Sequence, residues 1–184
     1  VTVSCGHCHP TITRRIVEQQ IRLQHATTIY LHPNLPLLAK RLAAKLPNDL
    51  EVTYFVNSGS EATELAINMA RAYTGHTDVI AQRNAYHGMS STSAGLTSHH
   101  TWRRDIPLGT RIHHAICPDP YRNPFEGTPE EIASKSAAEI QDLIRFSTPG
   151  QIAAFIAEPI QGVGGATAGA KNYLSEAYAI AREH

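Results

Sequence analysis

Short apolar runs alternate with helical patterns along most of this 184-residue chain. The runs at 52–56, 78–81, 112–116 and 152–157 have strand length and are rich in apolar residues. Strands that alternate with helices usually pair in parallel, through right-handed crossovers. The sequence therefore predicts an α/β fold with a mainly parallel sheet and flanking helices. Groups that bind a ligand should gather at the carboxyl ends of its strands.

Four segments carry the signals of helices: 10–23, 34–46, 60–74 and 128–146. Pro10 suits the first position of the first helix, and Thr128 is a suitable N-cap for the fourth. A further helix should open near Lys171. The third helix should end at Gly75 and pack on the sheet by its apolar side, which consists of Ala62, Leu65, Ala66, Met69, Ala70 and Tyr73.

Charge and cysteine content exclude several classes of partner. The formal net charge is zero, so no basic field favours nucleic acid, and no apolar run is long enough to span a bilayer. Three cysteines are too few for a disulfide framework, which indicates free thiols in a reducing compartment. The cluster Cys5-Gly6-His7-Cys8-His9 raises the alternative of a zinc site. Adjacent ligands rarely form a tetrahedron, so we expect no metal.

Residues Asn57-Ser58-Gly59-Ser60-Glu61 join the first strand run to the third helix. The exposed N–H groups of a first helical turn, with the positive end of the helix dipole, suit a phosphate. Gly59 would let the backbone approach the anion closely, and the two serines could add hydroxyl donors. The alternative is an ordinary capping box, with Ser58 as N-cap and Glu61 three residues later.

Four motifs in order along the chain resemble one known family. They are Gly6-His7-Cys8-His9-Pro10, Phe55-Val56-Asn57-Ser58-Gly59-Ser60-Glu61-Ala62, Tyr86-His87-Gly88 and Glu158-Pro159-Ile160-Gln161-Gly162. Each motif stands at the corresponding boundary of an expected element, which makes the combined match specific. Over nearly its whole length the chain resembles the class III pyridoxal-phosphate-dependent aminotransferases.

The resemblance implies a fold type I transferase, active as a homodimer with its sites near the dimer interface. Residues 1–33 would form an N-terminal segment, with a helix and a substrate-side loop, and residues 34–184 the first part of the large domain that binds pyridoxal phosphate. The implied reaction moves an amino group from an amino acid to a keto acid in two half-reactions.

The resemblance also assigns roles to individual residues. The cofactor phosphate would be bound by Ser58, Gly59 and Ser60. Tyr86 would stack on the cofactor ring, although it could otherwise be a core tyrosine. The remaining polar surroundings of the cofactor would be supplied by two residues, His87 and Glu158.

Two further positions bear on the substrate. Ornithine and 4-aminobutyrate aminotransferases have a second glutamate where this chain has Val163, and that glutamate pairs with an arginine. Valine cannot form this ion pair, so the pattern resembles the alanine-glyoxylate aminotransferase 2 subgroup. Alanine or a related amino acid would be the donor, and glyoxylate or pyruvate the acceptor. Tyr30 would line the substrate side, and the subgroup implies a mitochondrial location.

The four lysines, Lys40, Lys45, Lys135 and Lys171, do not match the sequence context of the family's catalytic lysine. The resemblance places that Schiff-base lysine, and the aspartate that protonates the cofactor ring, beyond His184. We therefore expect a truncated chain without a catalytic residue of its own. The alternative function is that of an inactive fragment, which binds the cofactor weakly or only packs against a partner subunit.

A dinucleotide-binding dehydrogenase is a poorer alternative. Residues 162–167 begin like a glycine fingerprint, but Thr167 stands where the third glycine belongs.

Overall fold

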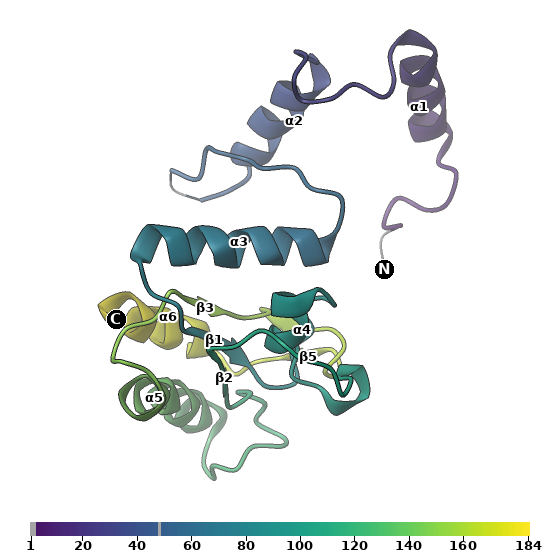
Figure 1. The fold of residues 1–184 in the computed structure, drawn as a ribbon. Coiled ribbons are helices and arrows are strands. Elements are labelled where there is room, and N and C mark those ends of the chain that lie inside the picture. The colour runs from purple at the N-terminus through teal and green to yellow at the C-terminus, as the bar shows by residue number, and fades with distance from the viewer. Residues whose placement is uncertain (1–2, 48) are drawn as a thin grey trace. The chain divides into compact units, whose positions relative to one another are not determined.

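A computed structural model describes residues 3–47 and 49–184 of the chain. The chain divides into two compact units, with the boundary between Tyr54 and Phe55 (Figure 1). This division by packing differs from the domain boundary expected between residues 33 and 34, which concerns the architecture of the family and stays a prediction.

The first unit contains two helices, α1 (Pro10–Arg22) and α2 (Asn34–Ala43). Pro10 occupies the first turn of α1, and Leu23 ends that helix in an extended conformation. Both predicted helices are confirmed, although α2 ends earlier than expected. The side chain of Asn34 donates a hydrogen bond of 3.1 Å to the Gln19 side chain. No residue of either helix is fully buried.

The second unit is built on a three-stranded parallel sheet in the order β2-β1-β3. β1 (Val79–Gln82) lies in the middle, between β2 (Ile112–Ala115) and β3 (Ala154–Ile156). The parallel sheet predicted from the alternating pattern is confirmed. A short antiparallel pair, β4 (Ile160–Gln161) and β5 (Thr167–Ala168), follows β3.

The prediction of a strand at residues 52–56 is wrong. These residues belong to no strand, and none makes a backbone hydrogen bond within the described part of the chain. Val52 keeps 81% and Tyr54 63% of its surface exposed. β-branched and aromatic side chains favour an extended backbone, but a strand also needs a neighbour to complete its hydrogen bonds.

Helices cover both faces of the sheet (Figure 1). α3 (Gly59–Thr74) and α4 (Ser91–Leu96) lie on one side, and α5 (Pro129–Ser147) and α6 (Tyr173–Glu183) on the other. Successive residues of a strand point to opposite faces. Val79 and Ala81 accordingly pack towards α3 and α4, while Ile80 packs towards α5 and α6. The central strand is therefore buried on both sides.

The helix signals around α5 and α3 are confirmed. Thr128 caps α5 in a capping box with Glu131, and Gly75 ends α3 in the left-handed conformation. A short 3₁₀ turn, η1 (His100–Trp102), follows α4. α6 begins at Tyr173, two residues after Lys171.

The packing face predicted for α3 is wrong. Ile67 is its one fully buried residue, whereas Ala62, Ala66 and Met69 are exposed and Tyr73 keeps 92% of its surface exposed. Polar contacts explain this orientation of the helix. The Arg71 guanidinium donates to the carbonyls of Thr77 and Thr110, and the Glu64 carboxylate accepts a hydrogen bond from the Ser90 hydroxyl.

A buried charge cluster joins the amino ends of β1 and β2. The Asp78 side chain is 2% exposed and accepts contacts of 2.9 Å from Arg111 and 2.7 Å from His113. The Asp78 carbonyl also accepts the Ala153 amide at 2.7 Å, which links this end of the sheet to the segment before β3.

Among the described helices, none combines the length and apolar character that a membrane span requires.

Replacing Asp78 with asparagine should lower the free energy of unfolding by about 2–4 kcal/mol, because one buried acceptor is lost and Arg111 loses its counter-charge. Urea unfolding followed by circular dichroism measures the change. Glu18→Gln is the control, because Glu18 forms an exposed pair with Arg14 and its loss should cost less than about 0.5 kcal/mol. Equal effects of the two changes would contradict a structural role for Asp78.

Candidate functional site

The start of α3 combines a cap with two free amide groups. The Ser58 hydroxyl oxygen accepts the Glu61 amide at 3.1 Å, and the Glu61 carboxylate accepts the Asn57 amide at 2.6 Å. The amides of Gly59 and Ser60 donate to no acceptor within the described residues. Ser58 is therefore the N-cap as expected, but the capping box is incomplete because Glu61 accepts the Asn57 amide and not the Ser58 amide. This cap leaves two N–H groups for an anion.

The loop after β1 lies directly against this helix start. The Met89 amide donates a hydrogen bond of 3.0 Å to the Ser60 hydroxyl oxygen. Gly88 has a φ of 122°, and a Cβ there would lie 2.5 Å from the Ser60 hydroxyl oxygen and 2.9 Å from its Cα. Glycine permits both the backbone conformation and this close approach. The fold thus brings the Tyr86-His87-Gly88 motif to the phosphate candidates.

Tyr86 is held by contacts to its backbone and its ring. Its amide donates a hydrogen bond of 2.8 Å to one carboxylate oxygen of Glu158, whose second oxygen accepts the Gly162 amide at 3.1 Å. The half-buried ring meets the Trp102 ring edge to face, with centroids 5.2 Å apart. Glu158 therefore joins the segment that carries Tyr86 to the loop after β4.

His87 is a half-buried imidazole. Its amide donates to the Thr97 hydroxyl at 2.9 Å, and its Nε2 atom is buried without a partner among the described residues. Burial lowers the pKa of His87, the Glu158 charge opposes this effect, and His114 adds to it. Burial also lowers the pKa of His114. Both rings are consequently neutral at neutral pH.

The predicted residues of the second unit thus gather in one region: Ser58, Gly59 and Ser60 at the α3 start, Tyr86 and His87 after β1, and Glu158 after β3. Tyr30 belongs to the first unit, where it lines an apolar hollow of about 250 Å³, and its substrate role stays a prediction. The assignment of the other six residues to a cofactor likewise stays a prediction.

The residue types that could form a Schiff base or bind a metal, lysine and cysteine, are spread through the chain. All four lysines have exposed positions, and Lys135 donates to the Glu126 carbonyl at 2.7 Å. Cys5 and Cys8 are exposed free thiols. Among residues 3–47 and 49–184, no three His, Cys, Asp or Glu side chains are placed to hold a metal ion.

Sequence analysis missed two residues that support this region, Gln161 and Trp102. Gln161 is 4% exposed and donates from its amide to the Arg83 carbonyl at 2.8 Å. It stands inside the Glu158-Pro159-Ile160-Gln161-Gly162 motif, so its position was available, but its contact across the chain was not. Trp102 is the single tryptophan of the sequence, and no local pattern connected it with Tyr86.

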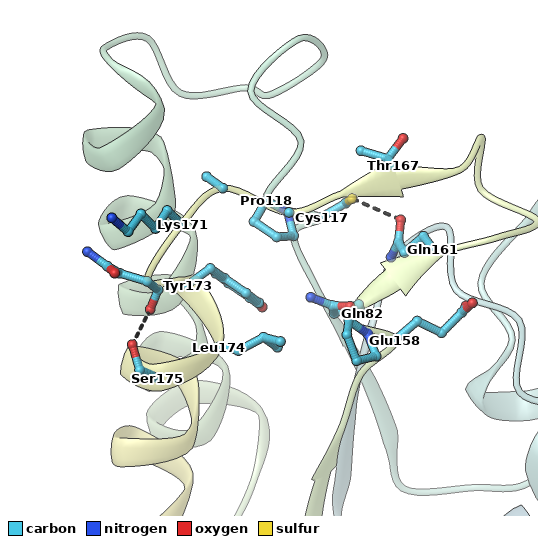
Figure 2. Close-up of a pocket in the computed structure, with 14 residues that line it drawn as sticks. Gln82, Cys117, Pro118, Glu158, Gln161, Thr167, Lys171, Tyr173, Leu174 and Ser175 are labelled. Carbon is cyan, nitrogen blue, oxygen red and sulfur yellow. Dashed lines mark hydrogen bonds between the residues drawn. The ribbon is translucent and has the colours of Figure 1, made fainter.

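A cavity of about 300 Å³ lies between the carboxyl ends of the strands and the start of α6. Figure 2 shows the Tyr173 ring reaching towards Gln82, while the Glu158 side chain extends away from Tyr173. The Gln82 Oε1 atom and the Tyr173 hydroxyl are buried and have no partner within the described residues. Glu158 therefore lines this cavity but directs its carboxylate to Tyr86 and Gly162.

The fold and this arrangement match a known class of protein. The family model of class III aminotransferases matches residues 1–184, so the chain belongs to that family. A transaminase from Thermomicrobium roseum superposes with a TM-score of 0.89 at 29% identity, over 97% of this chain and 42% of that one. A pyridoxal-phosphate-bound amine transaminase from an uncultivated Pseudomonas species gives 0.90 at 27%, over 97% and 43%. The predicted fold class is confirmed.

Curated relatives make the similarity more specific. The chain is 47% identical to mitochondrial alanine–glyoxylate aminotransferase 2 homolog 2 of Arabidopsis thaliana, over 96% of this chain and 36% of that protein. It is 40% identical to human mitochondrial alanine–glyoxylate aminotransferase 2, over 99% of this chain and 39% of that protein. The predicted family and subgroup resemblance are confirmed. The chain spans less than two fifths of the length of these relatives.

Gly88→Ala should separate the loop from the α3 start and lower the free energy of unfolding by more than about 2 kcal/mol, because the new Cβ collides with Ser60. Gly75→Ala is the matched control, because Gly75 also has a positive φ but open space around it, and should cost only about 1–2 kcal/mol. Hydrogen exchange of the Met89 amide, with urea unfolding, measures both effects. An unchanged Met89 exchange rate in Gly88→Ala would contradict the contact.

Stability should fall as the pH drops below the ordinary histidine pKa of 6.5, because the unfolded chain then binds protons that folded His87 and His114 resist. Each group contributes at most about 1.4 kcal/mol per pH unit. The contribution is complete above the unfolded pKa and is lost towards acid pH. Urea unfolding between pH 7.5 and 5.5 should show a shallower pH dependence in the His87→Gln, His114→Gln double variant. An equal pH dependence in the double variant and the unaltered chain would contradict this account of the two rings.

Proposed function

We propose that the protein to which this chain belongs is a pyridoxal-phosphate-dependent aminotransferase. It would move an amino group from alanine or a related amino acid to glyoxylate or pyruvate in two half-reactions. The observation that carries this proposal is the pair of free amides at Gly59 and Ser60, at a helix start that contacts the loop carrying Tyr86, whose own amide is bound by the Glu158 carboxylate. Membership of the class III family supports it.

The residues at the α3 start fit a phosphate group. Gly59 and Ser60 offer N–H donors at the positive end of a helix of 16 residues, and nothing lies within 4 Å of the position that a Gly59 Cβ would take. The hydroxyl oxygens of Ser58 and Ser60 already accept backbone amides, so their protons remain available for donation to an anion. The Glu61 carboxylate is engaged at the Asn57 amide.

Neighbouring groups suit the ring of the same cofactor. The Tyr86 ring would fix the plane of the pyridine ring by stacking. Neutral His87 would add a polar contact without adding charge, consistent with its lowered pKa. When bound, pyridoxal phosphate supplies an aldehyde that takes up the amino group and a ring that accepts electrons. The residues described here bind and orient; the lysine and aspartate of the reaction are proposed to lie beyond His184.

Val163 supports an α-amino acid such as alanine as the donor. It is an apolar residue with 40% of its surface exposed, directly after Gly162, which is bound to Glu158. A carboxylate at that position could hold an arginine away from some substrates, whereas valine cannot. The printed names of the relatives, alanine–glyoxylate aminotransferase 2, agree with this choice of substrates. We further propose a mitochondrial location, which the printed names give for the relatives, and a homodimer, which the resemblance to the family implies.

A second candidate function concerns the 184-residue chain by itself. All four of its lysines are exposed, and none stands in the sequence context of the family's catalytic lysine. The isolated chain would then bind pyridoxal phosphate without forming a reducible bond at one defined lysine, or would only pack against a partner subunit.

Absorbance between about 300 and 500 nm, with added pyridoxal phosphate, tests cofactor binding by the chain. Ser60→Ala should weaken binding roughly tenfold, because a hydroxyl donor to a charged phosphate is lost. Ser134→Ala is the control, since Ser134 bonds to Glu176 on the opposite helical layer and should leave binding unchanged.

Borohydride reduction and mass spectrometry then test the chemistry. We expect no single lysine of this chain to be labelled, whereas a longer form that includes the predicted lysine should be labelled there. Specific labelling of Lys40, Lys45, Lys135 or Lys171 would contradict the proposed position of the catalytic lysine. Absence of binding to both forms would contradict the aminotransferase proposal.

A further inference from the structure

Four residues run from the end of β1 up to and including the candidate stacking residue Tyr86, and side chains from a distant part of the chain contact this segment at both ends. The segment is 83–86, which follows β1 directly. The contacts come from residues 158–164, which follow β3. No helix or strand includes residues 83–86. Backbone hydrogen bonds to Ala115 and Ser98 hold residues 83–85, and the contacts from residues 158–164 add to them.

The Glu158 carboxylate holds the Tyr86 end of the segment by a hydrogen bond. One carboxylate oxygen accepts the Tyr86 amide at 2.8 Å and the other accepts the Gly162 amide at 3.1 Å. A carboxylate can accept at both oxygens, whereas a glutamine side chain offers one acceptor and one donor. In a Glu158→Gln variant, one of the two backbone N–H groups would therefore face another N–H group. Both carboxylate oxygens of Glu158 must therefore act as acceptors.

Gln161 holds the near end of the same segment. Its side-chain amide donates to the Arg83 carbonyl at 2.8 Å, and its side-chain oxygen accepts from the buried Cys117 thiol at 3.1 Å. The thiol contact assigns the oxygen and nitrogen of the Gln161 amide, so that its donor faces Arg83. Because Gln161 is 4% exposed, water cannot readily replace either partner.

A close backbone contact completes the arrangement. A Cβ on Gly164 would lie 2.7 Å from the Asn84 carbonyl oxygen, so only glycine permits the loop to approach the middle of the segment this closely. Segment 83–86 is thus contacted at its beginning, middle and end by Gln161, Gly164 and Glu158.

We propose that Glu158 and Gln161 are positioning residues, which act through the backbone of segment 83–86 to fix the plane of the Tyr86 ring. Glu158 would then serve the cofactor indirectly, by orienting the ring that stacks on it, with its own oxygens committed to two backbone amides. The role assigned to Tyr86 rests on the proposed function. The hydrogen bonds from Glu158 and Gln161 to this segment can be tested without any cofactor.

The chain contains its own reporter for the Tyr86 position. Trp102 is the single tryptophan, and its ring meets the Tyr86 ring at 5.2 Å, so its fluorescence responds to displacement of Tyr86. Acrylamide quenching of Trp102 in the cofactor-free chain should increase by about twofold or more in Glu158→Gln and Gln161→Ala, as the half-exposed ring loses its neighbour. Hydrogen exchange should accelerate at least tenfold in Glu158→Gln for whichever of the Tyr86 and Gly162 amides loses its acceptor.

Two control variants separate positioning from general loss of stability. Glu176→Gln makes the same chemical change at a carboxylate that accepts the Ser134 hydroxyl, and should change neither readout. Asp78→Asn removes a buried carboxylate at the opposite end of β1 and should lower stability without changing Trp102 quenching under native conditions. If Asp78→Asn raised quenching as much as Glu158→Gln, the effect would be one of stability, and the positioning role would be overturned.

Ligand binding adds a readout that distinguishes the ring from the phosphate. Glu158→Gln should weaken pyridoxal phosphate binding about tenfold but change the affinity for inorganic phosphate less than twofold, because phosphate uses the α3 start alone. Equal weakening of both ligands would overturn the assignment to the ring. Failure of both the unaltered chain and the longer form to bind pyridoxal phosphate would count against the proposed function. The Trp102 and exchange results would still decide whether Glu158 and Gln161 hold Tyr86.

Discussion

The central strand β1 is the constraint on which the second unit depends. Its residues are buried on both faces, because the strand pairs with β2 and β3 and is covered by helices on each side. A strand of this kind has a fixed direction and register, so the chain leaves its carboxyl end at a defined point. The segment that carries Tyr86 begins there, and it is held by backbone hydrogen bonds to Ala115 and Ser98 together with the side chains of Glu158 and Gln161.

Much of this architecture could be predicted from local patterns. The alternation of apolar runs and helices predicted the parallel sheet, and Thr128 and Gly75 marked helix ends because caps depend on neighbouring residues only. The strand expected at 52–56 fails for the opposite reason. Propensity for an extended backbone is local, whereas the partner that completes a strand is determined by the fold.

In the candidate site, too, local features could be predicted and contacts across the chain could not. The free amides of Gly59 and Ser60 follow from the first turn of any helix, so the sequence sufficed to find them. The orientation of α3 could not be predicted, because it depends on where Arg71 and Glu64 find partners. Gln161 was missed because a glutamine in a two-residue strand carries no signal until Arg83 and Cys117 are known to be beside it.

The buried Asp78 cluster lies at the amino end of β1, and the segment that Glu158 holds at Tyr86 begins at its carboxyl end. The length of this four-residue strand, roughly 13 Å at the usual rise, lies between them. Substitutions this far apart, without shared partners, generally have additive effects. An evolving chain could therefore vary the residues around Tyr86 while its stability is maintained from the other end of β1. Such separation lets one sheet acquire new substrate preferences without first losing its fold.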